Sequence, residues 1–334
     1  MFPSPDFFSA REYLKTYYPS DFDRERLLSV IDSVEKEMVA SDGVFDIHSL
    51  PAETRLSDEE VENAAIFHFL RKVSGRLLRA FPRGEAVLLD IGGGPTIYQH
   101  IPLCLNVSAI VHAEFSAGNR AEVQKYLDQD PRAYSWENYF SVVRQMLRED
   151  VSYQEILDVQ RKDDDTSVRE HAEQIRMALF SPDNAVLDRY LIQTLSNRIV
   201  SCDVFSSSLE LGESRELAET LREITEDGSP DIISAHFLIE SATDDPELWE
   251  RGVLHLTRKL RPRGYFIMTA IRNATWYRVG SEKVSAVSVN EQKIRKFLEE
   301  HDIVVEDMQV LQGSDQDDHG YDGMVFVFGR KIYS

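Results

Sequence analysis

The chain has 334 residues, enough for about two average domains or for one enlarged α/β domain with insertions. A hydrophobic content of 42% suffices for a packed core and excludes global disorder, and 16 glycines with 12 prolines are too few for a collagen-like chain. The formal net charge of −21 repels phosphate backbones and anionic lipid, so neither nucleic acid nor a membrane is expected as a partner.

The first part of the chain predicts helices. A short aromatic helix is expected over residues 8–18, and a second helix from about 22 to 40. A third begins at Ser57, where a serine cap and acidic residues in the first turn suit the helix dipole, and it stops at the Phe81-Pro82-Arg83-Gly84 segment. We interpret 1–82 as an N-terminal helical lid and 83–334 as the main domain.

Short apolar runs alternate with helical segments through the rest of the chain. This alternation predicts βαβ units, an α/β fold and a mostly parallel, Rossmann-like sheet. The last two runs are separated by only about eleven residues, too few for a crossover helix, so they predict a C-terminal antiparallel hairpin. This layout is that of class I S-adenosylmethionine-dependent methyltransferases. The runs cover residues 86–91, 108–115, 198–205, 230–237, 264–271, 303–311 and 323–330.

The second and third of these runs lie unusually far apart. One crossover does not need the more than 80 residues that join them, so we expect a helical insertion at about 120–197. Within it, the charged stretch 161–171 is interpreted as a solvated helix face.

Cysteine usage and the termini bear on the compartment. Cys104 and Cys202 are too few for a disulfide framework or a zinc cluster, so no metal site is expected. The N-terminus lacks the basic and apolar regions of a signal peptide, and no apolar run reaches the roughly 20 residues of a membrane span. We expect a cytoplasmic monomer or homodimer.

The strongest local signal is a glycine loop after the first strand. Asp90 is followed closely by Gly92-Gly93-Gly94-Pro95, and such a loop lies where open α/β sheets bind ligands. The loop contains G-x-G but lacks the third glycine of the dinucleotide-binding fingerprint, and Pro95 removes one backbone N–H that could hold a pyrophosphate. The loop therefore suits a nucleoside ligand without phosphates better than NAD. Glu114 ends the next strand and could accept both ribose hydroxyls, a pairing that serves either ligand. Asp203, after the third strand, is expected to face the adenine.

Several segments resemble one family in the right order. LLDIGGGPTIYQ (88–99) is similar to the glycine loop of the nicotinamide, phenylethanolamine and thioether/indolethylamine N-methyltransferase family. EYLKTYY (12–18) resembles its tyrosine helix, EFSAGNRAEVQKYL (114–127) its second strand and helix, and LRPRGYFIMTAIRNATWYRVG (260–280) its fifth strand and aromatic segment. The resemblance covers most of the chain, except roughly 19–80 and much of 137–197.

The resemblance implies S-adenosylmethionine as cofactor, with S-adenosylhomocysteine as product. The implied cofactor residues are Tyr13, Tyr18, Gly92, Gly93, Gly94, Thr96, Tyr98, Glu114, Phe115, Asn119, Asp203, Val204 and Ala235. The expected substrate-facing residues are Tyr17, His236, Thr269, Asn273, Trp276 and Tyr277. The acids expected to bind the acceptor or take its proton are Glu240, Asp317 and Asp318, the last two in an acid-rich hairpin.

The sequence departs from the family pattern at three of these positions. Gly93 stands where relatives often have serine, and Glu114 stands where aspartate is usual. Thr269 stands where the nicotinamide-type enzymes carry an acid, which speaks against nicotinamide itself as the acceptor.

Together these observations predict methyl transfer to a nitrogen of a small polar or cationic molecule, such as an amine, a guanidine or an amino-acid side chain. An O-, S- or C-methyltransferase on the same cofactor site is the first alternative. A nicotinamide-dependent oxidoreductase and a non-catalytic protein that keeps the fold are the others.

Overall fold

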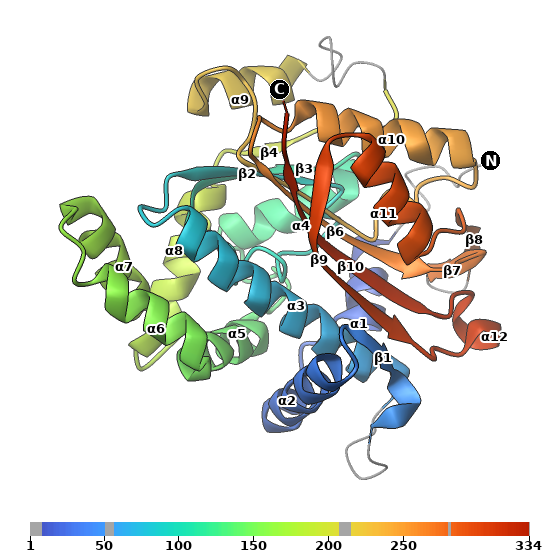
Figure 1. Ribbon diagram of the computed structural model, residues 1–334, viewed down its shortest axis with the longest axis horizontal. Coiled ribbons are helices and arrows are strands. Elements are labelled where there is room, and N and C mark those ends of the chain that lie inside the picture. Colours follow the sequence, from blue (N-terminus) through green and yellow to red (C-terminus); the bar gives the residue numbers. More distant parts are fainter. Residues whose placement is uncertain (1–8, 51–56, 207–214, 280–281, 334) are drawn as a thin grey trace.

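The computed structural model describes residues 9–50, 57–206, 215–279 and 282–333. Its centre is an eight-stranded sheet with the order β1-β9-β10-β6-β5-β2-β3-β4 (Figure 1). Every predicted strand is present, which confirms the α/β fold with a mostly parallel sheet and a terminal antiparallel hairpin. These strands are β2 (Ala86–Ile91), β3 (Val107–Ala113), β4 (Ile199–Val200), β5 (Ile232–His236), β6 (Tyr265–Arg272), β9 (Ile303–Gln312) and β10 (Gly323–Lys331).

Strand β2 lies in the middle of the parallel part of the sheet. All six of its residues are buried, as its continuous apolar run predicts. It pairs with β3 on one side, where Leu88 faces Ile110, and with β5 on the other, where Leu88 faces Ile232. The chain therefore leaves β2 in one direction and later returns on its other side. Ligands bind at such a switch point, outside the carboxyl ends of the strands.

Helices cover both faces of the sheet (Figure 1). Leu88 joins one apolar core with α2 (Arg24–Ala40), α3 (Asp58–Ala80) and the helices between residues 137 and 195. The next residue, Leu89, joins the other core with α9 (Arg215–Ile224), α10 (Pro246–Lys259) and α11 (Glu291–Glu300). This alternation follows from the period of two in a strand. Both faces of the sheet are thus buried, and the site lies at the carboxyl ends of its strands.

The N-terminal segment contains the expected helices and one unexpected strand. Helix α1 (Ala10–Tyr17) starts at Ser9, and α3 starts with a capping box between Ser57 and Glu60. Strand β1 (Val44–Asp46) pairs in parallel with β9, and the short 3-10 helix η2 (Ile47–Ser49) follows it. Three residues carry no periodic signal, so sequence alone does not show this strand.

The long connection between β3 and β4 is helical throughout most of its length. Helix α4 (Ala117–Leu127) is followed by α5 (Glu137–Glu149), α6 (Val151–Gln160), α7 (Thr166–Phe180) and α8 (Ala185–Leu195). Smaller elements are the 3-10 helix η3 (Cys104–Asn106), the antiparallel pair β7 (Trp276–Val279) and β8 (Glu282–Ser285), and α12 (Gln316–His319). None of the helices within the described ranges combines the length and the apolar character that crossing a bilayer requires.

Candidate cofactor site

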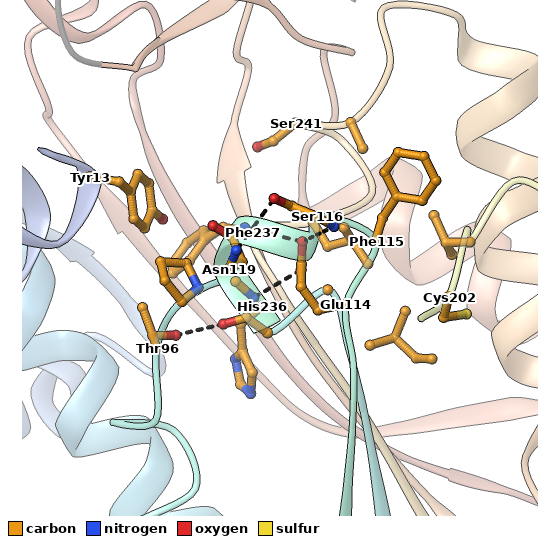
Figure 2. Close-up of a pocket in the computed structure, with 18 of the residues that line it drawn as sticks. Tyr13, Thr96, Glu114, Phe115, Ser116, Asn119, Cys202, His236, Phe237 and Ser241 are labelled. Carbon is orange, nitrogen blue, oxygen red and sulfur yellow. Dashed lines mark hydrogen bonds between the residues drawn. The ribbon is translucent and has the colours of Figure 1, made fainter. Parts of the chain in front are cut away.

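A cavity of about 520 Å³ lies at the carboxyl ends of β2, β3, β4 and β5 (Figure 2). Every cofactor residue predicted from the sequence lines it except Ala235, which is buried within β5. Of the predicted substrate residues, His236 and Tyr277 line it. The remaining wall is formed by Ile91, Pro95, Gln99, Ser116, Cys202, Phe205, Phe237, Leu238, Ser241, Ala242, Val279 and Val284.

The glycine loop bends because two of its residues adopt a left-handed backbone. Gly92 has φ +67° and Gly94 has φ +64°, a region that glycine occupies without steric cost. Thr96 holds the turn by donating its hydroxyl to the Gly93 carbonyl at 2.7 Å. Residue 95 is proline and has no N–H to donate. The N–H of Gly94, the residue before it, donates to a side chain.

That side chain is Glu114. Its Oε2 accepts a hydrogen bond from the Gly94 N–H at 3.1 Å, and its Oε1 accepts from the Ser116 N–H at 2.8 Å and from Asn119 Nδ2 at 3.1 Å (Figure 2). Burial raises the pKa of Glu114, while these three donors oppose the rise. The carboxyl group is therefore fixed in orientation, and its remaining lone pairs can accept bonds from vicinal hydroxyls in the cavity.

An apolar, partly open end of the cavity lies beyond Glu114. Phe115 is 57% exposed there, and Figure 2 shows its ring on the same side of the cavity as Cys202. Val204 is held by a contact between its carbonyl and His255 Nδ1 at 3.2 Å, and the Asp203 carboxylate accepts from the Phe205 N–H at 2.9 Å. An exposed ring on a fixed backbone is a suitable surface for stacking a flat heterocycle.

The other end of the cavity is closed by tyrosines from α1. Tyr18 stacks on Tyr98 with ring centroids 4.7 Å apart and an interplanar angle of 23°. Tyr13 lies 6.0 Å from Tyr18, and burial raises the pKa of both phenols, which keeps them neutral. Tyr17 turns away from this cavity and donates its hydroxyl to the Arg278 carbonyl at 2.7 Å, joining α1 to the β7–β8 pair.

A buried polar network supports the glycine loop from below. Asp90 Oδ2 lies 2.9 Å from His100 Nε2 and accepts from Gln99 Nε2 at 3.2 Å, while Asp90 Oδ1 accepts from Ser234 Oγ at 2.5 Å. Burial acts to raise the pKa of Asp90, but the neighbouring histidines outweigh it and hold that pKa well below its usual range. Burial lowers the pKa of His112, the next residue of the network, to about 4.

This network also explains the glycine at position 93. A Cβ atom there would lie 2.3 Å from Asp90 Oδ2 and 2.5 Å from His112 Cε1, closer than such atoms can approach. The histidine occupies the space that a serine side chain would need. His100 and His112 are both visible in the sequence, but nothing in their spacing indicates that their side chains meet beneath the loop.

The predicted substrate residues are divided between the cavity and its surroundings. His236 lines the cavity and its Nδ1 lies 3.2 Å from Thr269 Oγ1, so Thr269 stands behind it, fully buried. Asn273 donates to the Asp322 carboxylate at 2.9 Å. The Trp276 ring lies 3.5 Å from Lys283 Nζ. Neither Asn273 nor Trp276 is among the residues that outline the cavity.

The acidic hairpin does not reach the cavity. Asp317 and Asp318 are both exposed on α12 and are not among the described residues that line the cavity, and their contact with the acceptor stays a prediction. Glu240 is instead fully buried: Oε1 accepts from the Ile271 N–H at 3.0 Å, and Oε2 has no hydrogen-bond partner within the described part of the chain. Burial raises its pKa to about 7.

A second buried acid, Glu62, was not predicted from the sequence. It lies on α3, where Oε1 accepts from Ser314 Oγ at 2.6 Å and Oε2 accepts from the Tyr321 hydroxyl at 3.0 Å. Burial raises its pKa to about 7. Its neighbours Val61, Ala64 and Ala65 are apolar, and an acid on the apolar face of a predicted helix is the signal that could have drawn attention to it.

We expect Glu62→Gln to reduce the pH dependence of folding stability. The pKa of Glu62 rises from 4.5 to about 7 on folding, so its contribution to stability is full below pH 4.5 and is lost as the pH rises through about 7. Glutamine does not ionise, so the variant should exceed the parent by about 1–3 kcal/mol near pH 8 and differ little near pH 5. Urea unfolding at both pH values measures this. Asp32→Asn, exposed on α2, is the control, and unchanged pH slopes in Glu62→Gln would contradict the prediction.

Comparison with known proteins agrees with this geometry. The model of the NNMT/PNMT/TEMT family matches residues 54–166 and 188–332. The chain is 25% identical to phenylethanolamine N-methyltransferase of Macaca mulatta, over 77% of this chain and 78% of that protein. It is 24% identical to indolethylamine N-methyltransferase of Mus musculus (74% and 78% covered) and 21% identical to nicotinamide N-methyltransferase of Sus scrofa (74% and 77% covered). Because the family model matches more than half of the chain, the chain belongs to the NNMT/PNMT/TEMT family and is an S-adenosylmethionine-dependent N-methyltransferase.

Proposed function

We propose that this enzyme methylates a nitrogen of a small cationic acceptor, an amine or a guanidine. The observation that carries the proposal is the pairing of an aromatic cavity end with a buried carboxyl group, Glu240, whose charge acts on Tyr277 in that end. The relatives named for phenylethanolamine and indolethylamine support it, since both names describe amines.

The residues of the cavity wall support one placement of the cofactor. Glu114 accepts the two ribose hydroxyls, the exposed ring of Phe115 covers the adenine, and the glycine loop passes the methionine portion next to Tyr18. Tyr13, His236, Phe237 and Tyr277 then surround the remaining space, in which the acceptor binds. Oxygen and π-faces of neutral tyrosines attract both a sulfonium and an ammonium group.

Methyl transfer from a sulfonium is an in-line displacement in which the nitrogen lone pair attacks the methyl carbon and the sulfur leaves as a thioether. Since the cofactor supplies the leaving group, the protein mainly holds nucleophile, methyl and sulfur in line, and such alignment can supply on the order of 7–11 kcal/mol. The aromatic wall restricts the acceptor to one orientation and excludes water. The nitrogen must reach the methyl group with its lone pair free, and its proton leaves through a neighbouring carboxylate or water.

Glu240 supplies the negative charge behind this wall. Its charge raises the pKa of Tyr277, after burial and the effect of Tyr17, so the carboxyl group is electrostatically coupled to the cavity lining. Its pKa of about 7 reflects burial, opposed by the backbone N–H groups of Ile271 and of Glu240 itself. The carboxylate therefore forms as the pH rises through about 7, and attraction for a cation grows with it.

The substrate class is tested by S-adenosylhomocysteine release with a panel of amines, guanidines, pyridines, phenols and thiols, with mass spectra of the products. Turnover restricted to basic nitrogen compounds supports the proposal. Turnover of phenols or thiols alone would contradict the substrate class while leaving the cofactor site in place.

Glu240→Gln is expected to raise the acceptor KM by about tenfold above pH 8, because one charge–charge interaction of about 1–2 kcal/mol is lost. The affinity for S-adenosylhomocysteine should stay within twofold, roughly, since Glu240 lies outside the cofactor wall. In the parent, the acceptor KM should fall as the pH rises through about 7, and this dependence should vanish in the variant. Steady-state kinetics with a guanidine acceptor, whose own charge does not change, measure both.

The same kinetics on the Asp317→Asn/Asp318→Asn double variant distinguish the buried acid from the exposed ones. Both aspartates are exposed on α12, so the variant should match the parent. A raised acceptor KM in that variant, together with normal kinetics in Glu240→Gln, would restore the role predicted from the sequence and remove Glu240 from the proposal.

A further inference from the structure

Three metal-binding side chains converge beneath the glycine loop: Asp90 from the end of β2, His100 from the segment after the loop, and His112 from β3. Their side chains are completely buried, and one donor atom from each lies within 4.8 Å of the others. We propose that Asp90, His100 and His112 form a binding site for a divalent transition-metal ion, with zinc as the ion of choice. The proposal is independent of the acceptor and concerns the stability of the cofactor loop.

The distances between the donor atoms are close to those of a metal centre. His100 Nε2 lies 2.9 Å and His112 Nδ1 lies 3.7 Å from the same oxygen, Asp90 Oδ2. Ligands at about 2.0–2.1 Å from a tetrahedral zinc ion are roughly 3.3 Å apart, so each of these two distances differs from that separation by about 0.4 Å. Two imidazoles and one carboxylate are a donor set that suits zinc.

The hydrogen bonding of His112 argues for a cation at this point. His112 Nε2 lies 3.1 Å from the Gly94 carbonyl, which accepts only, so Nε2 must carry the proton. A neutral imidazole that donates from Nε2 has a lone pair at Nδ1, and this atom has no hydrogen-bond partner among the residues that the structure describes. The lone pair at Nδ1 therefore faces the carboxylate of Asp90 at 3.7 Å in a fully buried position, and the two repel each other. A cation bound by both atoms removes that repulsion and gives the buried Nδ1 atom a partner.

Outer hydrogen bonds support two of the three proposed ligands, Asp90 and His112. Asp90 Oδ1 accepts from Ser234 at 2.5 Å, and Gln99 donates to Oδ2 at 3.2 Å. The contact between His112 and the Gly94 carbonyl fixes the tautomer that leaves Nδ1 available, as outer hydrogen bonds to metal ligands commonly do. Three protein ligands leave one position of a tetrahedral ion for a water molecule.

The site would join three separate parts of the chain directly below the cofactor. A Cβ on Gly93 would touch both Asp90 and His112, which shows how closely the loop rests on these ligands. An ion there would hold the loop in its binding conformation and would take no part in the methyl transfer. Removal of the metal should therefore weaken cofactor binding. Because metal content and cofactor affinity are measured without an acceptor, failure of this inference and failure of the proposed function are distinguishable.

The test measures metal content of the full chain purified without chelator from zinc-supplemented cultures. We expect about one zinc per chain in the parent and less than about 0.2 in His100→Ala and His112→Ala. His68→Ala is the matched control, because His68 is also a buried histidine but lies on α3 beside Arg71, and it should keep the zinc. Chelator treatment of the parent should lower its Tm and its affinity for S-adenosylhomocysteine, and zinc, but not magnesium, should restore both.

A second measurement covers the case in which the variants fail to fold. Cobalt(II) added to the chelator-treated parent should give the visible absorption of a tetrahedral ion with nitrogen and oxygen ligands, displaced by one equivalent of zinc. A parent without bound zinc and without this absorption would overturn the proposal. Equal zinc content in the parent and in both folded histidine variants would overturn it as well.

Discussion

Gly93→Ala is expected to abolish detectable cofactor binding and to lower the free energy of unfolding by about 2–4 kcal/mol. The added Cβ would lie 2.3 Å from Asp90 Oδ2 and 2.5 Å and 2.7 Å from two atoms of the His112 ring. None of these atoms is the far end of a flexible exposed chain: Asp90 is held by Ser234 and His112 by the Gly94 carbonyl, and both are fully buried. The loop itself must therefore move.

A displaced loop loses two features of the cavity together. Gly93 and Gly94 form part of its wall, and the Gly94 N–H is one of the donors that orient Glu114. We expect the Kd for S-adenosylhomocysteine to rise by at least about 100-fold, corresponding to about 2.7 kcal/mol. Isothermal titration gives the affinity, and urea unfolding gives the stability.

Gly118→Ala is the control for this prediction. Gly118 lies on α4 near the cavity, and a Cβ there would meet only Ser116 Oγ, at 3.7 Å, an ordinary contact. Since alanine is the better helix former, this variant should bind the cofactor normally and be slightly more stable. A Gly93→Ala variant that binds within about threefold of the parent would show that Asp90 and His112 can yield, and would contradict the packing argument.

Glu114→Gln should weaken cofactor binding by about 2–3 kcal/mol, or roughly 30- to 150-fold. Three donors converge on the carboxylate, from Gly94, Ser116 and Asn119. An amide offers them one oxygen instead of two and turns an NH₂ group towards another N–H. The ribose hydroxyls also lose a hydrogen-bond acceptor, because one carboxylate oxygen has been replaced by an NH₂ donor.

Glu114→Asp separates charge from reach. Aspartate keeps both acceptor oxygens but is one methylene shorter, so we expect an intermediate Kd, between those of the parent and of Glu114→Gln. Asp128→Asn, on the exposed surface just after α4, removes one charge far from the cavity wall and should leave the Kd unchanged. Equal affinities of the parent and Glu114→Gln, measured by isothermal titration, would mean that Glu114 only shapes the loop and does not bind the ribose.

The sequence by itself determined what depends on neighbouring residues. The apolar run 86–91 is buried on both sides as a central strand, and Gly92-Gly93-Gly94-Pro95 can form only a tight loop at its end. Glu114 then follows at the end of the adjacent strand. In a parallel sheet these positions come together at the carboxyl ends of neighbouring strands. The glycine loop and its acidic partner could therefore be predicted from spacing, while the other cofactor residues were implied by the family resemblance.

The tertiary structure alone decided which ionisable groups are buried. Asp317, Asp318 and Glu240 have similar chemistry and no distinguishing sequence pattern. The first two are nevertheless exposed, while packing against distant segments buries Glu240 and raises its pKa to about 7. His112 reaches Asp90 only because β2 and β3 pair in register. Burial and convergence depend on contacts between residues far apart in the chain, and local sequence patterns carry no record of those contacts.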